Sequence, residues 1–170
     1  MEIEEAVRTR RTHKVYGPEP VDRLTLESLF ELARWAPNHH LTNPWRFRVL
    51  GPAALAALKE AAGPLDGAKL DRAPTLIVVS AVQVDDDPAQ AQEDRDATAV
   101  AGYLVLLGAH ARGLAGYWRT PGVLRTPQGR AAVGMDDDEA VLGLLHLGPA
   151  RQEQRVPDRA PVDAIARFLA

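Results

Sequence analysis

A group of basic side chains near the start of the chain has the composition of an anion-binding site. Arg8, Arg10, Arg11 and Lys14 fall within seven residues, with Thr12 among them. Arginine forms planar, bidentate hydrogen bonds with phosphate oxygens, and a threonine hydroxyl adds a neutral donor. The group suits a terminal phosphate monoester that carries two negative charges. A solvated basic turn is the alternative that composition alone leaves open.

A proline-bounded loop is the second candidate. Residues 36–47 are Ala-Pro-Asn-His-His-Leu-Thr-Asn-Pro-Trp-Arg-Phe. The amides of Asn38 and Asn43 and the imidazole of His39 can hydrogen-bond the edge of a heteroaromatic ring. His39 and His40 lack the spacing of a metal-binding pair on one helix face. A loop without a ligand remains the alternative.

The third candidate is a glycine-rich turn at residues 113–122, Gly-Leu-Ala-Gly-Tyr-Trp-Arg-Thr-Pro-Gly. Its glycines let the backbone approach a ligand closely, so that free N–H groups can face a ring nitrogen. The alternative is a tight turn around the core residue Trp118.

Several kinds of chemistry are excluded by missing residues and motifs. The chain has no cysteine, which removes disulfides, thiolate metal sites and cysteine nucleophiles. It also lacks a dinucleotide fingerprint, a phosphate loop, a His-Glu-x-x-His motif and a Gly-x-Ser-x-Gly elbow. The aspartates at 85–87 and 136–138 do not have a calcium-loop spacing, so we interpret them as solvated carboxylates and predict no metal site.

The elements that must position these candidates follow from periodicity and from capping residues. Helices are predicted over residues 2–9, from Asp22 or Thr25 to a stop at Pro37, over 53–62, from about Glu93 to Arg112, and over 126–133. Strands are predicted over 46–50, 75–82, 115–118 and 140–147, and the second of these has the continuous apolar character of a strand buried on both faces. This order is α/β or α+β, with a polar tail from Gly148 that ends in an apolar turn at Ile165, Phe168 and Leu169.

Length and composition bound the class of protein. A chain of 170 residues without repeats or linkers predicts one domain over residues 1–170. Its net charge of −3 argues against a nucleic-acid partner. The acidic N-terminus is unlike a signal peptide, and the longest apolar run, 97–111, is too short for a membrane span. We therefore expect a cytoplasmic protein that binds neither nucleic acid nor membrane.

Taken together and in this order, the motifs resemble those of the FMN-dependent nitroreductase family, in particular its short, compact members. The family's first motif, Arg-Arg/His-Ser-x-Lys/Arg-x-Phe/Tyr, corresponds to residues 10–16. Its second, which begins Ala/Ser-Pro-Ser and ends Gln-Pro-Trp-x-Phe, corresponds to residues 36–47, with Asn43 in place of the glutamine. Gly113–Gly116 and Trp118–Thr120 correspond to the turn that contacts the ring. Leu147–Ala150 and Arg159 correspond to the last strand and the basic tail.

The resemblance implies an α+β fold, a three-layer α/β/α sandwich with a mainly antiparallel central sheet flanked by helices. It also implies a homodimer that binds FMN at the subunit interface, with the C-terminal tail crossing to the partner subunit. Arg10, Arg11 and Thr12 would bind the phosphate together with Arg159, and Arg8 would belong only to the helix surface. Lys14 would reach the ribityl chain or the pyrimidine end of the ring. The remaining expected cofactor-binding residues are Asn38, His39, Asn43, Trp118, Arg119 and Thr120, with the backbone of the last two beside flavin N5.

The implied activity is a ping-pong reduction in which NAD(P)H reduces FMN, and FMN then passes two electrons to a nitroaromatic, a quinone or a similar small acceptor. No side chain is required as a catalytic nucleophile, because the flavin carries the chemistry. An FMN-binding carrier or sensor without nicotinamide-dependent turnover is the alternative function.

Overall fold

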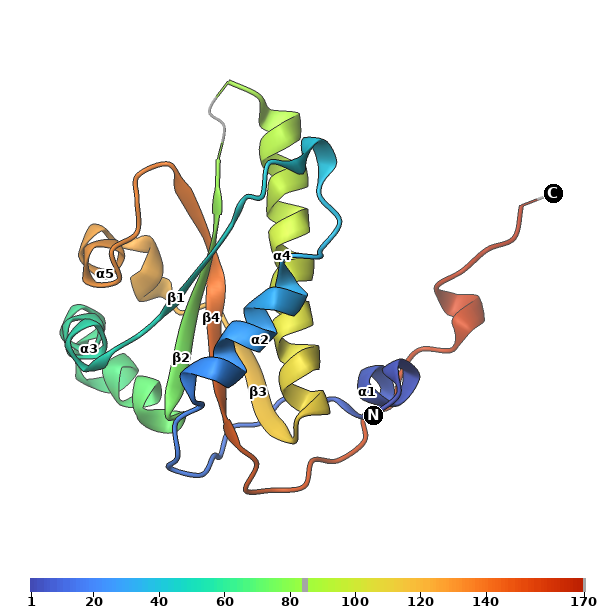
Figure 1. Cartoon of the computed structure of the whole chain (residues 1–170), viewed down its shortest axis with the longest axis horizontal. Helices are drawn as coiled ribbons and strands as arrows, with labels where there is room; N and C mark the ends of the chain where they lie inside the picture. Colours follow the sequence, from blue (N-terminus) through green and yellow to red (C-terminus); the bar gives the residue numbers. More distant parts are fainter. Residues whose placement is uncertain (84–85, 170) are drawn as a thin grey trace.

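The computed structural model describes residues 1–83 and 86–169 (Figure 1). Its sheet has the strand order β1-β2-β4-β3, and every neighbouring pair is antiparallel. The strands are β1 (Trp45–Val49), β2 (Thr75–Val82), β3 (Leu114–Arg119) and β4 (Glu139–Pro149). The helices are α1 (Ile3–Thr9), α2 (Arg23–Ala33), α3 (Pro52–Gly67), α4 (Pro88–Ala111) and α5 (Pro127–Ala132), and short 3₁₀ turns lie at 39–41, 68–72, 122–125 and 162–164.

Two hydrophobic cores lie on opposite faces of the sheet. Since side chains alternate along a strand, Ile77 and Val79 face α2 and α4, whereas Leu76 and Val78 face the other side. There Leu58 of α3 and residues near α5 close the second core. Figure 1 shows α3 and α5 on one side of the sheet and α2 and α4 on the other. The predicted three-layer sandwich with an antiparallel sheet is confirmed.

Side-chain caps fix the starts of α2 and α4, although α4 does not begin where the sequence predicted. The Asp22 side chain accepts the backbone N–H of Thr25 at 2.9 Å and caps α2 as expected. Helix α4 begins at Pro88, five residues before the predicted start at Glu93, because the Asp87 carboxylate caps it by accepting the N–H groups of Ala89 and Gln90. Asp87 thus has a structural role, whereas Asp85 lies outside the described residues.

The helix predicted over 53–62 ends at Gly63 as expected, but a second helical segment follows it directly. Gly63 adopts a φ of +74°, which breaks the regular helix as expected. Pro64 then restarts it, because proline suits a first helical position, and α3 continues to Gly67.

Trp118 of β3 is fixed between α4 and β4. A Cβ atom on Gly102 of α4 would lie 2.6 Å from Cζ3 of Trp118, so only glycine lets the indole pack this closely. On β4 the pairing with β2 passes from Gly143 to Val141 and skips Leu142, which is a β-bulge. The Leu142 carbonyl at this bulge accepts the Trp118 indole N–H at 3.3 Å.

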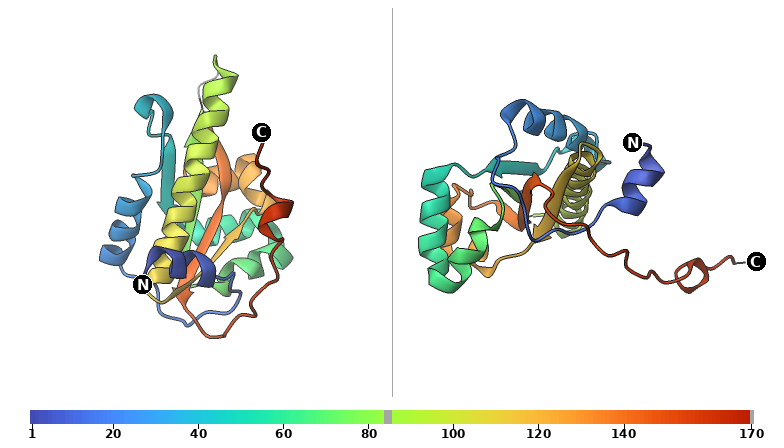
Figure 2. Two further views of the ribbon diagram at one scale, coloured as in Figure 1. Left: turned by 90° about the vertical axis from the view of Figure 1, so that its right-hand side faces the viewer. Right: turned by 90° about the horizontal axis from the view of Figure 1, so that it is seen from below.

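Both ends of the chain leave the sandwich at the same end of the sheet. Helix α1 packs on α4, and the segment after it runs beside β3 and β4 through backbone bridges Thr12–Gly116 and Tyr16–Ala150. The tail then extends away from the body, as Figure 2 shows. Its apolar side chains Ile165, Phe168 and Leu169 are 75%, 97% and 91% exposed. Contact of this tail with a partner subunit stays a prediction.

Candidate functional site

The arginines singled out in the sequence line one cavity. It measures about 400 Å³ and lies between α1, α4 and the start of the tail. Arg10 and Arg11 share it with Arg159, which is nearly 150 residues further along the chain. Arg8 lines it as well, but its side chain is 80% exposed on α1, so the expectation that Arg8 belongs only to the helix surface stays a prediction. The other lining residues are Val7, Tyr103, Val156 and Pro157.

Each arginine in this cavity has a different local role. The guanidinium carbon of Arg10 lies 5.6 Å from the centroid of the Tyr103 ring, within cation–π range. Nη1 of Arg11 donates to the carbonyl oxygens of Arg8 and Arg10 at 2.7 and 2.8 Å, which fixes the bend after α1. Arg8 forms an exposed ion pair with Glu4 at 3.4 Å.

Two donors at this cavity are buried without a hydrogen-bond partner in the described part of the chain. They are Nε of Arg10 and Nε of Arg11. A buried donor that makes no hydrogen bond costs about 1–3 kcal/mol. An anion with several oxygens would satisfy both and would compensate the converging positive charge. The residues present therefore fit a phosphate group.

Thr12 and Lys14 lie on the segment that leaves this cavity. The Thr12 backbone pairs with Gly116 of β3, and the side chains of both residues are exposed. Neither residue lines the cavity. The segment that carries Thr12 and Lys14 runs from the arginines along β3, at the edge of the sheet.

The loop at residues 38–43 is organised by the amides that were expected to contact a ligand. Oδ1 of Asn38 accepts the backbone N–H of Asn43 at 2.7 Å, and its Nδ2 donates to the Thr42 hydroxyl at 2.9 Å. Nδ2 of Asn43 donates to the Leu41 carbonyl at 2.7 Å. The Asn43 amide nitrogen therefore serves the loop, which leaves its side-chain oxygen and the exposed surface of the loop for a ligand.

Helix α4 anchors this loop near its N-terminal end. Asp94 is only 1% exposed, and its Oδ1 accepts a hydrogen bond from the Thr42 hydroxyl. Nε2 of Gln90 donates to the same Oδ1 at 3.0 Å. Nδ1 of His39 lies 2.5 Å from Oε2 of Glu93, and the His39 ring stacks on the ring of His40. His40, Leu41 and Asn43 all have positive φ, an unusual conformation for residues other than glycine. The loop is thus held in a strained and specific shape.

The end of β3 presents its backbone and Thr120, while the Trp118 indole is engaged in the core and Nη1 of Arg119 is buried without a hydrogen-bond partner in the described part of the chain. The Trp118 indole packs in the core between sheet and α4. Arg119 lies on the opposite face of the strand, where its charge acts on the buried His146 and on Asp66 of α3. Thr120 is exposed. The expected contacts of the Arg119 and Thr120 backbone with a flavin ring stay a prediction.

The 38–43 loop, Trp118 and the cavity residue Arg10 contact α4 at different positions along its axis. The loop meets it at Glu93 and Asp94, Trp118 meets it at Gly102, and Arg10 meets it at Tyr103. Nine helical residues separate Asp94 from Tyr103, roughly 13 Å along the axis. Figure 1 accordingly shows the 38–43 loop beside one end of α4 and α1 beside the other. A single chain keeps the loop and the arginine cavity apart.

Three residues near these groups were not predicted from the sequence, namely Tyr103, Asp94 and His110. Tyr103 and His110 are seven residues apart, so they share one face of α4. Two polar groups on one face of an otherwise apolar helix were the sequence signal that could have predicted a role for Tyr103 and His110. Asp94 carries no such signal, because only the folded loop reveals its partner Thr42.

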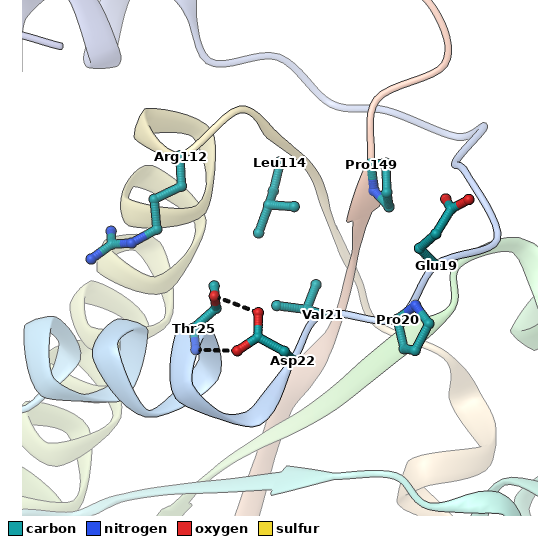
Figure 3. A pocket seen from close by; sticks show the side chains of 8 residues that line it. All are labelled: Glu19, Pro20, Val21, Asp22, Thr25, Arg112, Leu114 and Pro149. Atoms are coloured by element: carbon teal, nitrogen blue, oxygen red, sulfur yellow. Dashed lines mark hydrogen bonds between the residues drawn. The ribbon is translucent and has the colours of Figure 1, made fainter.

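A second cavity, of about 270 Å³, lies at the start of α2 and contains none of the predicted site residues (Figure 3). The Asp22 carboxylate in it is used as a helix cap, since it accepts both the N–H and the hydroxyl of Thr25. Nη1 of Arg112 donates to the Gly108 carbonyl of its own helix. The polar groups here serve the fold.

Two features are absent from residues 1–83 and 86–169, a metal-binding cluster and a membrane-spanning helix. No group of three or more His, Asp or Glu side chains within these ranges could hold a metal ion. None of the helices found there combines the length and the apolar character that crossing a membrane requires.

The architecture and the cavity define an α/β/α sandwich protein with an arginine-lined cavity beside α4. The sequence pattern of the nitroreductase family matches residues 7–149. The chain therefore belongs to the nitroreductase family of oxidoreductases.

Individual relatives agree with this assignment. YfhC of Bacillus subtilis, provisionally named an NAD(P)H nitroreductase, is 27% identical over 94% of this chain and 90% of its own length. YdjA of Escherichia coli K12, with the same provisional name, is also 27% identical, over 94% of this chain and 96% of its own.

Solved structures share the fold. A nitroreductase-like family protein from Bacillus cereus superimposes with a TM-score of 0.89 at 22% identity, covering 99% of this chain and 96% of its own. The FMN and NADPH-dependent nitroreductase NfnB from Sphigopyxis sp. strain HMH gives a TM-score of 0.83 at 18% identity, with full coverage of both chains.

Proposed function

We propose that this protein is an FMN-dependent oxidoreductase that uses NAD(P)H to reduce nitroaromatics, quinones or similar acceptors by a ping-pong mechanism. The observation that carries the proposal is the cavity in which Arg10, Arg11 and Arg159 converge and two buried arginine N–H groups lack partners. NfnB, named as FMN and NADPH-dependent, and the curated NAD(P)H nitroreductase relatives support it.

The cavity suits the phosphate end of FMN. A phosphate monoester carries nearly two negative charges at neutral pH and three acceptor oxygens. Arg10 and Arg11 offer buried donors, and Arg159 of the tail brings a further charge to the rim. Charge-assisted hydrogen bonds of this type are roughly twice as strong as neutral ones. Thr12, next in the chain, would add a hydroxyl donor from the exposed edge.

When bound, FMN would supply the two-electron chemistry, first accepting hydride from the nicotinamide and then reducing the acceptor. The chain would supply binding and electrostatics. Lys14 is an exposed cation on the segment that leads away from the phosphate cavity. A cation near the pyrimidine end of the ring would stabilise the negative charge that develops there on reduction. Asn38, His39 and Asn43 on the strained loop, and the backbone at Arg119 and Thr120, would bind the ring.

A homodimer is part of the same proposal. The loop and the arginine cavity lie at different heights of α4 within one chain, so a second chain would bring one against the other. The tail offers exposed apolar side chains that its own body leaves uncovered, such as Phe168 at 97%. Light scattering after gel filtration measures the assembly, and a monomer that retains FMN and turnover would contradict this part.

The purified full chain tests the function directly. We expect flavin absorption bands, release of FMN rather than FAD on denaturation, and oxidation of NADH or NADPH with nitrofurazone or a quinone as acceptor. Bound FMN that neither nicotinamide reduces would favour the carrier or sensor alternative. A colourless protein that takes up neither flavin would overturn the proposal.

A further inference from the structure

A hydrogen bond joins α1 to α4 directly beside the arginine cavity. Oγ1 of Thr9, the last residue of α1, lies 2.8 Å from Nε2 of His110, the second-last residue of α4. Thr9 is followed immediately by Arg10 and Arg11, which line the cavity. The contact therefore fixes the position of the arginine segment, residues 8–11, on α4.

The direction of this hydrogen bond follows from the other bond of the same hydroxyl. Oγ1 of Thr9 donates its proton to the Glu5 carbonyl at 2.6 Å. It must then accept from His110, so Nε2 of His110 carries a proton. A neutral His110 has Nδ1 as its free acceptor, and a protonated His110 keeps the same bond to Thr9. Protonation thus adds charge without breaking the α1–α4 contact.

The charges around His110 come mainly from the arginine segment. Burial lowers the pKa of His110, the positive charges of Arg10 and Arg11 lower it further, and Glu5 of α1 opposes them. His13 lies within electrostatic reach of the same group, and burial together with His110 and Arg10 lowers its pKa too. These charges therefore disfavour an additional positive charge on His110.

We propose that His110 is a positioning residue of the phosphate cavity, which holds the arginine segment on α4 through Thr9 and takes up a proton when a phosphate monoester binds. The proposal rests on FMN as the ligand of this cavity. A phosphate dianion would offset the charges of Arg10 and Arg11, which removes part of the penalty on a protonated His110. Linkage then requires that the histidine strengthen FMN binding as the pH falls through its titration range.

Two substitutions separate the two roles. His110→Gln keeps an N–H donor for Thr9 but cannot titrate, whereas His110→Leu removes both the donor and the charge. FMN dissociation constants are measured between pH 6 and 8.5, from the flavin fluorescence that returns when the full-length holoprotein is diluted. The phosphate has its own second ionisation near pH 6, which acts equally in all three proteins. The ratio between wild type and variant therefore isolates the histidine.

We expect His110→Gln to bind FMN like the wild type at pH 8.5 and to bind progressively more weakly than the wild type towards pH 6, with an upper limit of about three- to tenfold for a pKa change of half a unit to one unit. His110→Leu should bind more weakly than the wild type even at pH 8.5, with an unchanged thermal midpoint as evidence of folding.

Equal pH slopes in the wild type and His110→Gln would overturn proton uptake. Equal affinities of the wild type and His110→Leu at pH 8.5 would overturn the positioning role. Either result leaves the proposed function intact, because that function fails only if the wild type does not bind FMN or does not turn over.

Discussion

Arg10 lies over the ring of Tyr103, with its guanidinium carbon 5.6 Å from the ring centroid. The ring thereby orients an arginine whose Nε is buried and has no partner among the described residues. Removal of the ring should loosen the guanidinium and weaken FMN binding by about two- to fivefold, the range of an exposed cation–π contact of 0.5–1 kcal/mol. Tyr103→Leu tests this by fluorescence titration, with Tyr103→Phe as the control that keeps the ring. A Phe variant as weak as the Leu variant would contradict it.

Loss of both cavity arginines should abolish FMN retention. Arg10→Ala combined with Arg11→Ala removes two sets of charge-assisted hydrogen bonds, each worth about 1.5–3 kcal/mol. The purified double variant should be nearly colourless, with an FMN dissociation constant raised at least about 100-fold. Arg23→Ala is the matched control, since Arg23 forms an exposed pair with Glu27 on the distant helix α2. Unchanged flavin content in the double variant would refute the phosphate assignment.

Gly102 should not accept even one methyl group. Glycine to alanine within a helix normally gains about 1 kcal/mol. Here the new Cβ would lie 2.6 Å from the Trp118 ring, and overpacking of a core costs about 1–3 kcal/mol. Gly102→Ala should therefore lower the free energy of unfolding in urea, whereas Ala99→Gly, at an exposed position of the same helix, should lower it only by the helix propensity. A stabilised Gly102→Ala protein would show that Trp118 has room to move.

Asp94 should control the order of the 38–43 loop. Its carboxylate accepts from Thr42 and Gln90 and is the buried anchor of the loop. Asp94→Ala should speed hydrogen exchange at residues 38–43 and lower the free energy of unfolding by about 1–3 kcal/mol. Gln92→Ala removes an exposed side-chain pair on the same helix and serves as the control. Unchanged exchange in the loop would mean that its own hydrogen bonds suffice.

His146 should make the protein less stable as the pH falls. Burial, together with the charges of Arg119 and Arg72, lowers the pKa of His146 to about 4. The unfolded chain, with a pKa near 6.5, binds the proton more readily, so stability is lost as the pH drops from about 6.5 towards 4. The full loss over this window is about 3 kcal/mol. His146→Leu should flatten this slope in urea unfolding at several pH values, and an unaltered slope would assign the effect to other groups.

Local patterns in the sequence were sufficient for most elements of the fold. The strand at Thr75–Val82 has the predicted bounds, because a continuous apolar run flanked by polar residues specifies a central strand. The start of α4 was misplaced, because Pro88 and its cap Asp87 precede the apolar periodicity. The restart of α3 at Pro64 was missed, because glycine followed by proline ends a helix more often than it continues one.

The site was predictable by residue type and less so by geometry. The convergence of Arg10, Arg11 and Arg159 followed from the family resemblance, and the fold brings them to one cavity. The hydrogen bonds that Asn38 and Asn43 form within their own loop could not be predicted. They depend on positive φ angles at His40 and Leu41, which a sequence rarely indicates. The roles of Tyr103 and His110 depend on contacts across about 100 residues, which no local pattern encodes.

Helix α4 contacts the loop, Trp118 and the arginine segment. The number of its residues between these contacts therefore sets their spacing and their relative rotation about the helix axis. One residue inserted between Asp94 and Gly102 would turn everything after it by about 100° around the helix axis and advance it by about 1.5 Å. The loop would keep its anchor, yet Gly102, Tyr103 and His110 would all face the wrong neighbours. Relatives that retain the cofactor should therefore vary in length at the two ends of this helix and not within it.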